Sequence, residues 1–160
     1  MKQSTPDLCD AHPELVQVVS GLHWQSFGGV VAFGGPIETV KCFEDNSRVK
    51  EALSEQGNGR VLVVDGGGSL RNALIGDLIA AKAAENSWAG IIIYGACRDV
   101  DVLPDIPFGV IALGCVPQKS VRRGEGQTGL PVFFGGVGFR PGEWVYADAN
   151  GIITAPRQLD

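Results

Sequence analysis

Residues 76–99 read GDLIAAKAAENSWAGIIIYGACRD, a stretch that predicts a helix followed by a buried strand. The helix is expected over Leu78–Asn86 and the strand over Ala89–Tyr94. A helix of ~10 residues rises ~15 Å, and a strand of ~5 residues spans ~16 Å. Because these lengths nearly cancel, the chain returns to the edge that it left. Asp77 is therefore expected beside Arg98-Asp99, after twenty intervening residues.

Two carboxylates with a cation between them allow two interpretations. In the first they are structural ion pairs, with Asp77 capping the helix and Arg98 holding Asp99. In the second, Asp99 is an oxygen ligand for Mg²⁺ or Mn²⁺, and Arg98 binds a substrate carboxylate through two parallel hydrogen bonds. Free backbone N–H groups of Leu78 and Ile79 would bind that carboxylate too, and Asp77 would act as acid or base on a metal-bound water. Spacing alone leaves both open.

The pattern along the rest of the chain predicts a layered α/β fold with mixed strands in a single domain, residues 1–160. Gly34-Gly35 is expected as a tight turn, and Asp148–Gly151 as the turn of a final hairpin. Further helices are expected at residues 5–19 and 48–56, and further strands at 30–33, 37–43, 61–64, 110–113, 132–134, 137–139, 144–147 and 152–154.

Composition limits the classes of function. With 13 basic and 18 acidic residues, the net charge of -5 leaves no surplus to neutralise phosphates, so no nucleic-acid partner is expected. The basic cluster at residues 119–123 is expected to be a solvated loop. No apolar run approaches ~20 residues, which predicts no membrane span. The absence of an apolar leader and the four scattered cysteines predict a cytoplasmic protein with reduced thiols.

Other possible motifs fail on inspection. Gly66-Gly67-Gly68-Ser69 follows a strand, but Arg71 stands where a dinucleotide-binding loop needs glycine, and no Gly-Lys-Ser/Thr follows. His12 and His23 have no partner at metal-ligand spacing and are expected to be structural. Cys97 is expected as a small buried residue rather than a nucleophile.

The chain resembles the RraA-like family, which covers the regulator of ribonuclease E activity A and the class II 4-hydroxy-4-methyl-2-oxoglutarate aldolases. The resemblance lies in GGGSLRNALIGDLIAAKAAENSWAGIIIYGACRDVD, in VFFGGVGFRPGEWVYADANGII behind it, and in TPDLCD and FGG in front, and covers roughly residues 5–155. The family's Asp-x20-Arg-Asp motif is met by Asp77, Arg98 and Asp99. The resemblance implies an α/β/β sandwich with a mixed sheet, of the swivelling-domain type.

The resemblance also implies chemistry. Asp99 and waters would hold a divalent cation, with Asp77 at a metal-bound water. Pyruvate's carboxylate would lie against Arg98 and the backbone from Gly76 to Ile79. Such a lyase would cleave 4-hydroxy-4-methyl-2-oxoglutarate to two pyruvates and decarboxylate oxaloacetate, since both reactions pass through the pyruvate enolate. The regulator branch implies the alternative, a protein that inhibits ribonuclease E by contact without catalysis; the intact motif favours the enzyme.

The resemblance has one local departure and one consequence for assembly. Aldolases of the family often carry a further acid three residues after the second Asp, where this chain has Val102. Some also carry a C-terminal extension with an acid, whereas this sequence stops at Asp160. Decarboxylation is expected to suffer less than aldol cleavage. A homotrimer with sites between subunits is implied, and Trp24, Phe27 and Phe33 are apolar residues that such contacts would cover.

Overall fold

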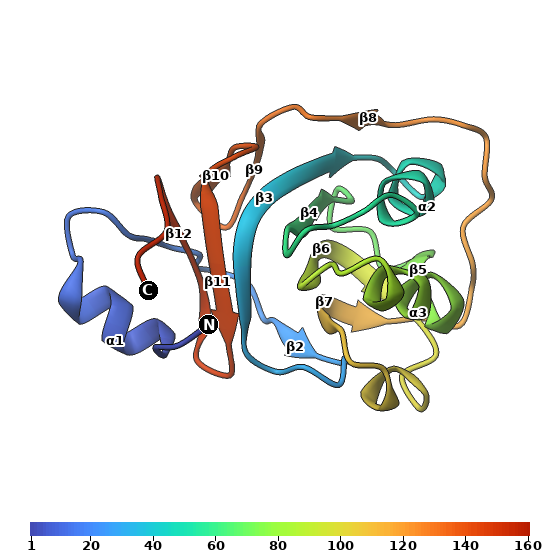
Figure 1. The fold of residues 1–160 in the computed structure, drawn as a ribbon. Coiled ribbons are helices and arrows are strands. Elements are labelled where there is room, and N and C mark those ends of the chain that lie inside the picture. The colour runs from blue at the N-terminus through green and yellow to red at the C-terminus, as the bar shows by residue number, and fades with distance from the viewer.

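A ten-stranded mixed sheet organises the computed structural model, which describes residues 1–160 (Figure 1). The helices are α1 (Thr5–Ala11), α2 (Ser47–Leu53), α3 (Asp77–Glu85) and a 3₁₀ turn, η1 (Leu103–Asp105). The strands are β1 (Gln17–Val18), β2 (Gln25–Ser26), β3 (Phe33–Lys41), β4 (Val61–Asp65), β5 (Ala73–Ile75), β6 (Gly90–Cys97), β7 (Gly109–Cys115), β8 (Gln127–Thr128), β9 (Val132–Phe134), β10 (Val137–Phe139), β11 (Trp144–Asp148) and β12 (Gly151–Ala155).

One half of the sheet is parallel and carries helices on one face. Strands β3, β4, β6 and β7 lie side by side in that order, all parallel. The apolar runs Val61–Val64 and Ile91–Ile93 are fully buried, as expected for strands covered on both faces. Helices α2 and α3 cover one face, where Val49, Leu53 and Ala80 join a single apolar cluster.

The other half is antiparallel and folds over the free face of the parallel half. Strand β3 belongs to both halves, because its other edge pairs with β11, which pairs in turn with β12. A second cluster joins Ile92 of the parallel half to Phe134 and Phe139 of the β9–β10 hairpin and to Val145 of β11. The result is an α/β/β layering, which confirms the expected fold class. Helix α1 packs outside β11 and β12 (Figure 1).

Several expected elements were wrong. Residues 30–32 form no strand, and the helix expected over residues 48–56 ends at Leu53. The helix at the start stops at Ala11 rather than residue 19, since Pro13 lacks an N–H and disfavours helical geometry at His12. Gly34-Gly35 is not a turn but lies inside β3, which begins only at Phe33. A Cβ at Gly34 would come within 2.6 Å of the Tyr146 ring, so glycine serves close packing there rather than chain reversal.

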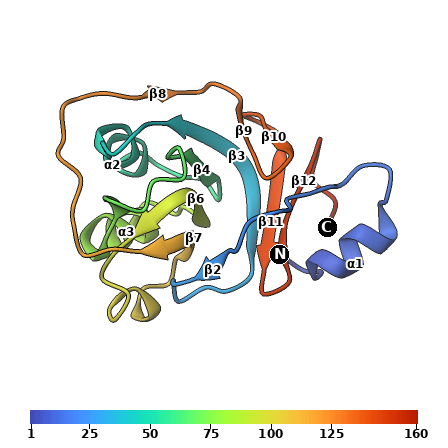
Figure 2. The same cartoon turned by 180° about the vertical axis from the view of Figure 1, so that it is seen from behind.

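The connection from β7 to β9, residues 116–131, runs around the outside of α3 and α2 and contains the short strand β8 (Figures 1 and 2). Phe33 is buried, and Trp24 and Phe27 are half-buried against the clusters of their own chain. Their apolar character does not by itself require a subunit interface. No helix here has the length and apolarity needed to cross a bilayer.

Candidate functional site

The motif residues meet where α3 begins and β6 ends, as their spacing predicted. Strand β5, which was not expected, pairs in parallel with the end of β6 and leads through Gly76 into α3. The N–H of Arg98 donates to the carbonyl of Ile75 at 3.0 Å and closes this edge. The predicted bounds of α3 differ from the observed ones by one residue at each end. A β–α–β unit therefore brings Asp77 to Arg98 and Asp99.

The two carboxylates have different partners. Oδ2 of Asp99 accepts the backbone N–H of Asp77 at 3.0 Å and lies 3.7 Å from Nε of Arg98. Asp99, and not Asp77, thus satisfies the first N–H of α3. The structural ion pair and the pocket position are both present, so the ion pair does not exclude the functional interpretation.

The backbone at the start of α3 offers fewer free donors than expected. The N–H of Leu78 donates to Oδ1 of Asp77 at 2.8 Å and is therefore occupied. The first helical hydrogen bond runs from Ala80 to Gly76, which leaves the N–H of Ile79 without an intrachain acceptor. A bound carboxylate would use the Ile79 N–H directly and would compete with Asp77 for that of Leu78.

Gly76 and Asp99 depend on each other sterically. A Cβ at Gly76 would lie 2.3 Å from Oδ2 of Asp99, so the carboxylate can dock on the helix only over glycine. Asp99 itself has φ of +58°, a left-handed conformation that is uncommon outside glycine. Such strained residues gather at functional sites.

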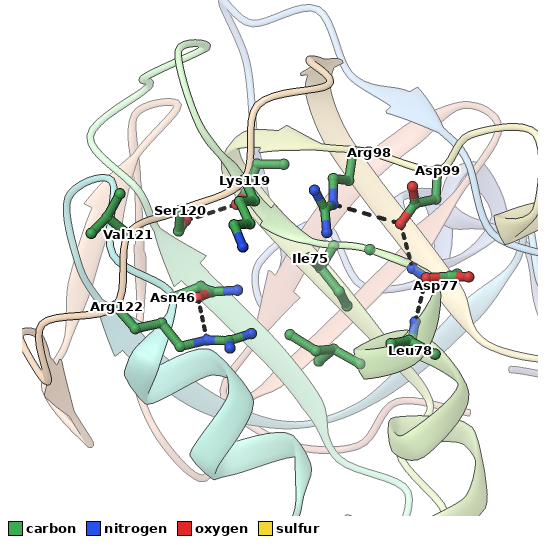
Figure 3. Close-up of a pocket in the computed structure, with 13 residues that line it drawn as sticks. Asn46, Ile75, Asp77, Leu78, Arg98, Asp99, Lys119, Ser120, Val121 and Arg122 are labelled. Atoms are coloured by element: carbon green, nitrogen blue, oxygen red, sulfur yellow. Dashed lines mark hydrogen bonds and ion pairs between the residues drawn. The ribbon is translucent and has the colours of Figure 1, made fainter.

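All six predicted site residues line one pocket of about 310 Å³ (Figure 3). Asp77, Leu78, Arg98 and Asp99 are labelled there, and Gly76 and Ile79 complete this first wall. Val102 does not line the pocket, and Asp101 borders a separate hollow that shares Arg98 and Asp99.

A second wall was missed from the sequence. It consists of Asn46 and the segment Lys119–Arg122, which was expected to be a solvated loop. The hydroxyl of Ser120 donates to the carbonyl of Ala73 at 2.8 Å, and Nε of Arg122 donates to Oδ1 of Asn46 at 3.0 Å. No local pattern marks this segment, because its partners lie more than forty residues away.

Asp45, which is buried behind the second wall, holds that wall in place through hydrogen bonds. Its carboxylate is 2% exposed and accepts the backbone N–H of Arg123 at 2.7 Å, that of Glu125 at 3.3 Å, and both the N–H and the hydroxyl of Ser47. Burial favours the neutral acid, but these hydrogen bonds to the charged form outweigh it and lower the pKa of Asp45 to about 2. The segment is thus held by a buried anion.

The donors of the site fit a hard divalent cation that keeps most of its waters. No three His, Cys, Asp or Glu side chains of this chain surround a common point, so a cation bound here would need oxygen ligands besides such side chains. Oδ2 of Asp99 accepts the N–H at the start of the helix, while Oδ1 makes no hydrogen bond and is available as a single oxygen ligand.

Cys97 lies near the site but does not have the character of a nucleophile. Burial is the main cause that raises its pKa to about 12, which agrees with a non-nucleophilic thiol.

Comparison with known proteins agrees with this geometry. A family model described as Aldolase/RraA matches residues 5–154. A protein of Alcanivorax borkumensis, named "Putative 4-hydroxy-4-methyl-2-oxoglutarate aldolase", is 68% identical over 97% of both chains. The structure of the RNA-processing inhibitor RraA from Thermus thermophilis is 41% identical with a TM-score of 0.94, covering 100% of this chain and 96% of its own.

A third relative carries a different name. The structure named S-adenosylmethionine: 2-dimethylmenaquinone methyltransferase, from Geobacillus kaustophilus, is 47% identical with a TM-score of 0.95, covering 98% of this chain and 97% of its own. The three names differ, whereas the fold and the nearly complete coverage agree. With its Asp77, Arg98 and Asp99 at one pocket and the family match over residues 5–154, the chain belongs to the RraA-like family.

Proposed function

We propose that the protein is a lyase that cleaves 4-hydroxy-4-methyl-2-oxoglutarate into two pyruvates and decarboxylates oxaloacetate, with Mg²⁺ or Mn²⁺ as cofactor. The observation that carries this proposal is the convergence of Asp77, Arg98 and Asp99 on one pocket with the N–H of Ile79. The aldolase name of the Alcanivorax borkumensis relative supports this activity.

Arg98 binds the carboxylate next to the keto group. Its guanidinium points into the pocket (Figure 3), and only its Nε faces Asp99. The two terminal nitrogens present a planar fork that matches a carboxylate. The Ile79 N–H at the positive end of α3 adds a second donor.

Asp77 acts as the acid–base residue of the site. Its half-buried carboxylate lies at the helix start, held only by its own Leu78 N–H, so it can turn towards the ligand. In the aldol cleavage it would take up the proton of the C4 hydroxyl through a water as the C3–C4 bond breaks. A cation bound at Asp99 would supply positive charge that stabilises the pyruvate enolate.

The pocket favours a small anion over a nucleoside methyl donor. None of its lining residues is aromatic, and three of them, Arg98, Lys119 and Arg122, are cations. An adenine ring would find no aromatic side chain to stack on, whereas a keto acid would find complementary charge. The methyltransferase name of one structural relative is therefore not carried over to this chain.

Pyruvate release from each substrate, with Mg²⁺ and with EDTA, tests the proposal. We expect Mg²⁺-dependent release that EDTA abolishes. Asp99→Ala should lose it, while Asp105→Ala, an exposed acid on η1 outside the pocket, should keep it. Absence of metal-dependent pyruvate from both substrates rejects the lyase, and full activity of Asp99→Ala rejects the metal ligand.

Arg98→Lys separates the contribution of the planar guanidinium from that of its positive charge. Lysine keeps the positive charge but lacks the planar pair of donors. We expect a raised KM and a lower kcat, with kcat/KM down roughly ten- to hundredfold, because a bidentate contact is replaced by a point charge. Steady-state kinetics with both substrates provide the measurement, and unchanged constants would remove Arg98 from the carboxylate site.

The second candidate function is inhibition of ribonuclease E by protein contact. It is favoured by the 41% identity to the RNA-processing inhibitor RraA over the whole chain. That function needs no pocket, so Asp99→Ala would leave it intact while abolishing lyase activity. A ribonuclease E cleavage assay with wild type and Asp99→Ala distinguishes the two.

The assembly into a homotrimer stays a prediction. Phe43 and Phe133 are more than half exposed and are better candidates for a covered surface than the three aromatic residues named from the sequence. Sedimentation equilibrium measures the assembly directly; a monomer at micromolar concentration would contradict it.

A further inference from the structure

We propose that Arg122, assisted by Lys119, forms the binding site for the second carboxylate of a dicarboxylic 2-keto acid. This inference rests on the proposed function, since it assumes that Arg98 binds the first carboxylate. It assigns a substrate-selecting role to the wall that faces Arg98 across the pocket (Figure 3).

The second wall carries positive charge with no acid paired to it. Asp99 lies beside Arg98, but neither Lys119 nor Arg122 forms a salt bridge with any residue of the chain. The side chain of Arg122 makes one hydrogen bond, from Nε to Oδ1 of Asn46. Its two terminal nitrogens therefore remain free to bind an anion.

These cations are positioned rather than loose. Lys119 sits in a parallel bridge with Ala73, and its carbonyl accepts the side-chain amide of Asn72 at 3.0 Å. On the other side of Arg122, the backbone of Arg123 is tied to the buried carboxylate of Asp45. Because the chain is fixed on both sides, Arg122 loses less conformational freedom on binding than a lysine or arginine in a solvated loop would lose.

The two walls match the charge pattern of the substrate. A dicarboxylic keto acid with a five-carbon main chain, such as 4-hydroxy-4-methyl-2-oxoglutarate, has carboxylates at both ends, and both need cationic partners when they leave water. Arg98 with the α3 N-terminus supplies one, and Arg122 with Lys119 supplies the other. In Figure 3 the charged ends of Arg98, Lys119 and Arg122 point into the space between the walls.

The two reactions differ in what happens to the distal carboxylate that this wall would bind. Aldol cleavage breaks C3–C4, leaves the electron pair on C3 as the enolate, and turns the C4 alcohol into the ketone of a pyruvate that keeps the distal carboxylate. In oxaloacetate decarboxylation the distal carboxylate itself leaves as CO₂ and its charge passes to the enolate. A cation on that carboxylate stabilises the starting ion. Arg122 thus favours cleavage over decarboxylation.

Calorimetric titration with two unreactive probes tests the site directly. In the presence of Mg²⁺, 2-oxoglutarate carries the second carboxylate, and 2-oxopentanoate has a methyl group in its place. We expect wild type to bind 2-oxoglutarate about tenfold or more tightly than 2-oxopentanoate, as for one hydrogen-bonded ion contact. Arg122→Ala should remove this preference by weakening 2-oxoglutarate alone, and Lys119→Ala should reduce it partly.

Arg123→Ala is the matched control. Arg123 is the adjacent exposed arginine, but it does not line the pocket, and only its backbone N–H is used. This variant should keep the wild-type preference. Equal binding of the two probes to wild type, or equal weakening of both by Arg122→Ala, would overturn the inference.

Kinetics add a second, separable readout. Arg122→Ala should lower kcat/KM for 4-hydroxy-4-methyl-2-oxoglutarate about tenfold while oxaloacetate decarboxylation falls less or rises. Equal losses on both substrates would contradict the preference for cleavage. If wild type releases no pyruvate from either substrate, the proposed function fails, and the probe titration alone decides the carboxylate site.

Discussion

The two walls of the pocket come from different levels of the structure. The first wall, residues 76–79 with Arg98 and Asp99, is built within one β–α–β unit, where the parallel pairing of β5 with the end of β6 places Asp77 beside the Arg-Asp pair. The second wall, Asn46 with residues 119–122, joins segments that meet only through long-range hydrogen bonds. Substitutions at the start of α3 should therefore disturb the first wall. Substitutions of residues that hydrogen-bond to the second wall from elsewhere in the chain should disturb the second.

Gly76→Ala should have the largest effect and should act on the first wall alone. The added Cβ would overlap Oδ2 of Asp99, at 2.3 Å, and push the carboxylate off the helix start. The overlap is with a side chain and the φ of -135° at Gly76 suits alanine, so the fold should survive. We expect pyruvate release to fall at least ~100-fold. Circular dichroism should stay native; an active variant would contradict the role of Asp99 docking.

Asp45→Ala should come next and should act on the second wall. It leaves the partly buried N–H groups of Ser47 and Arg123 without their acceptor, which costs roughly 2 kcal/mol of unfolding free energy. Urea unfolding measures the loss. The preference for 2-oxoglutarate should weaken too, although Asp45 does not line the pocket. Stability like wild type would show that Asp45 does not anchor the segment.

Lowering the pH should reproduce part of the loss of unfolding free energy that is expected for Asp45→Ala. Because the pKa of Asp45 is lowered to about 2 from 3.8, its contribution is complete above about pH 5 and disappears as pH falls through 3.8 towards 2. The contribution is roughly 2 kcal/mol. The difference in unfolding free energy between wild type and Asp45→Ala should therefore shrink between pH 6 and pH 3. Asp148, whose pKa is also lowered despite its burial because Thr5 donates to it, should titrate alike in both proteins. A constant difference would contradict the sign.

Ser120→Ala should have the smallest effect. It removes a single hydrogen bond, from the hydroxyl to the carbonyl of Ala73, at a cost of about 1 kcal/mol. Lys119 should then be held less firmly, with a small decrease in the 2-oxoglutarate preference. Thermal unfolding together with the probe titration measures both. A loss as large as that of Asp45→Ala would mean that the wall depends on this bond more than on the buried carboxylate.

The successes and failures of sequence reasoning follow the same division. Some elements were predictable because they leave a pattern in consecutive residues. They are the buried strands at Val61–Val64 and Ile91–Ile93 and the helix that begins at Asp77. Gly34-Gly35 was interpreted as a turn because glycine favours turns. The pair instead lies in β3, where the neighbouring Tyr146 and Gly59 leave no room for a Cβ.

The sequence by itself predicted the first wall, because the spacing between Asp77 and Arg98-Asp99 indicated one edge of a sheet. In the structure these residues come together because β5 and β6 pair in parallel and end side by side at Ile75 and Cys97. The sequence also determined the layered α/β class, through the pattern of apolar runs. Only the tertiary structure decided the second wall. Lys119 and Arg122 carry the same charges in a solvated loop as in a binding pocket. What distinguishes the two is the set of acceptors at Asp45, Asn46 and Ala73, which folding brings from far along the chain.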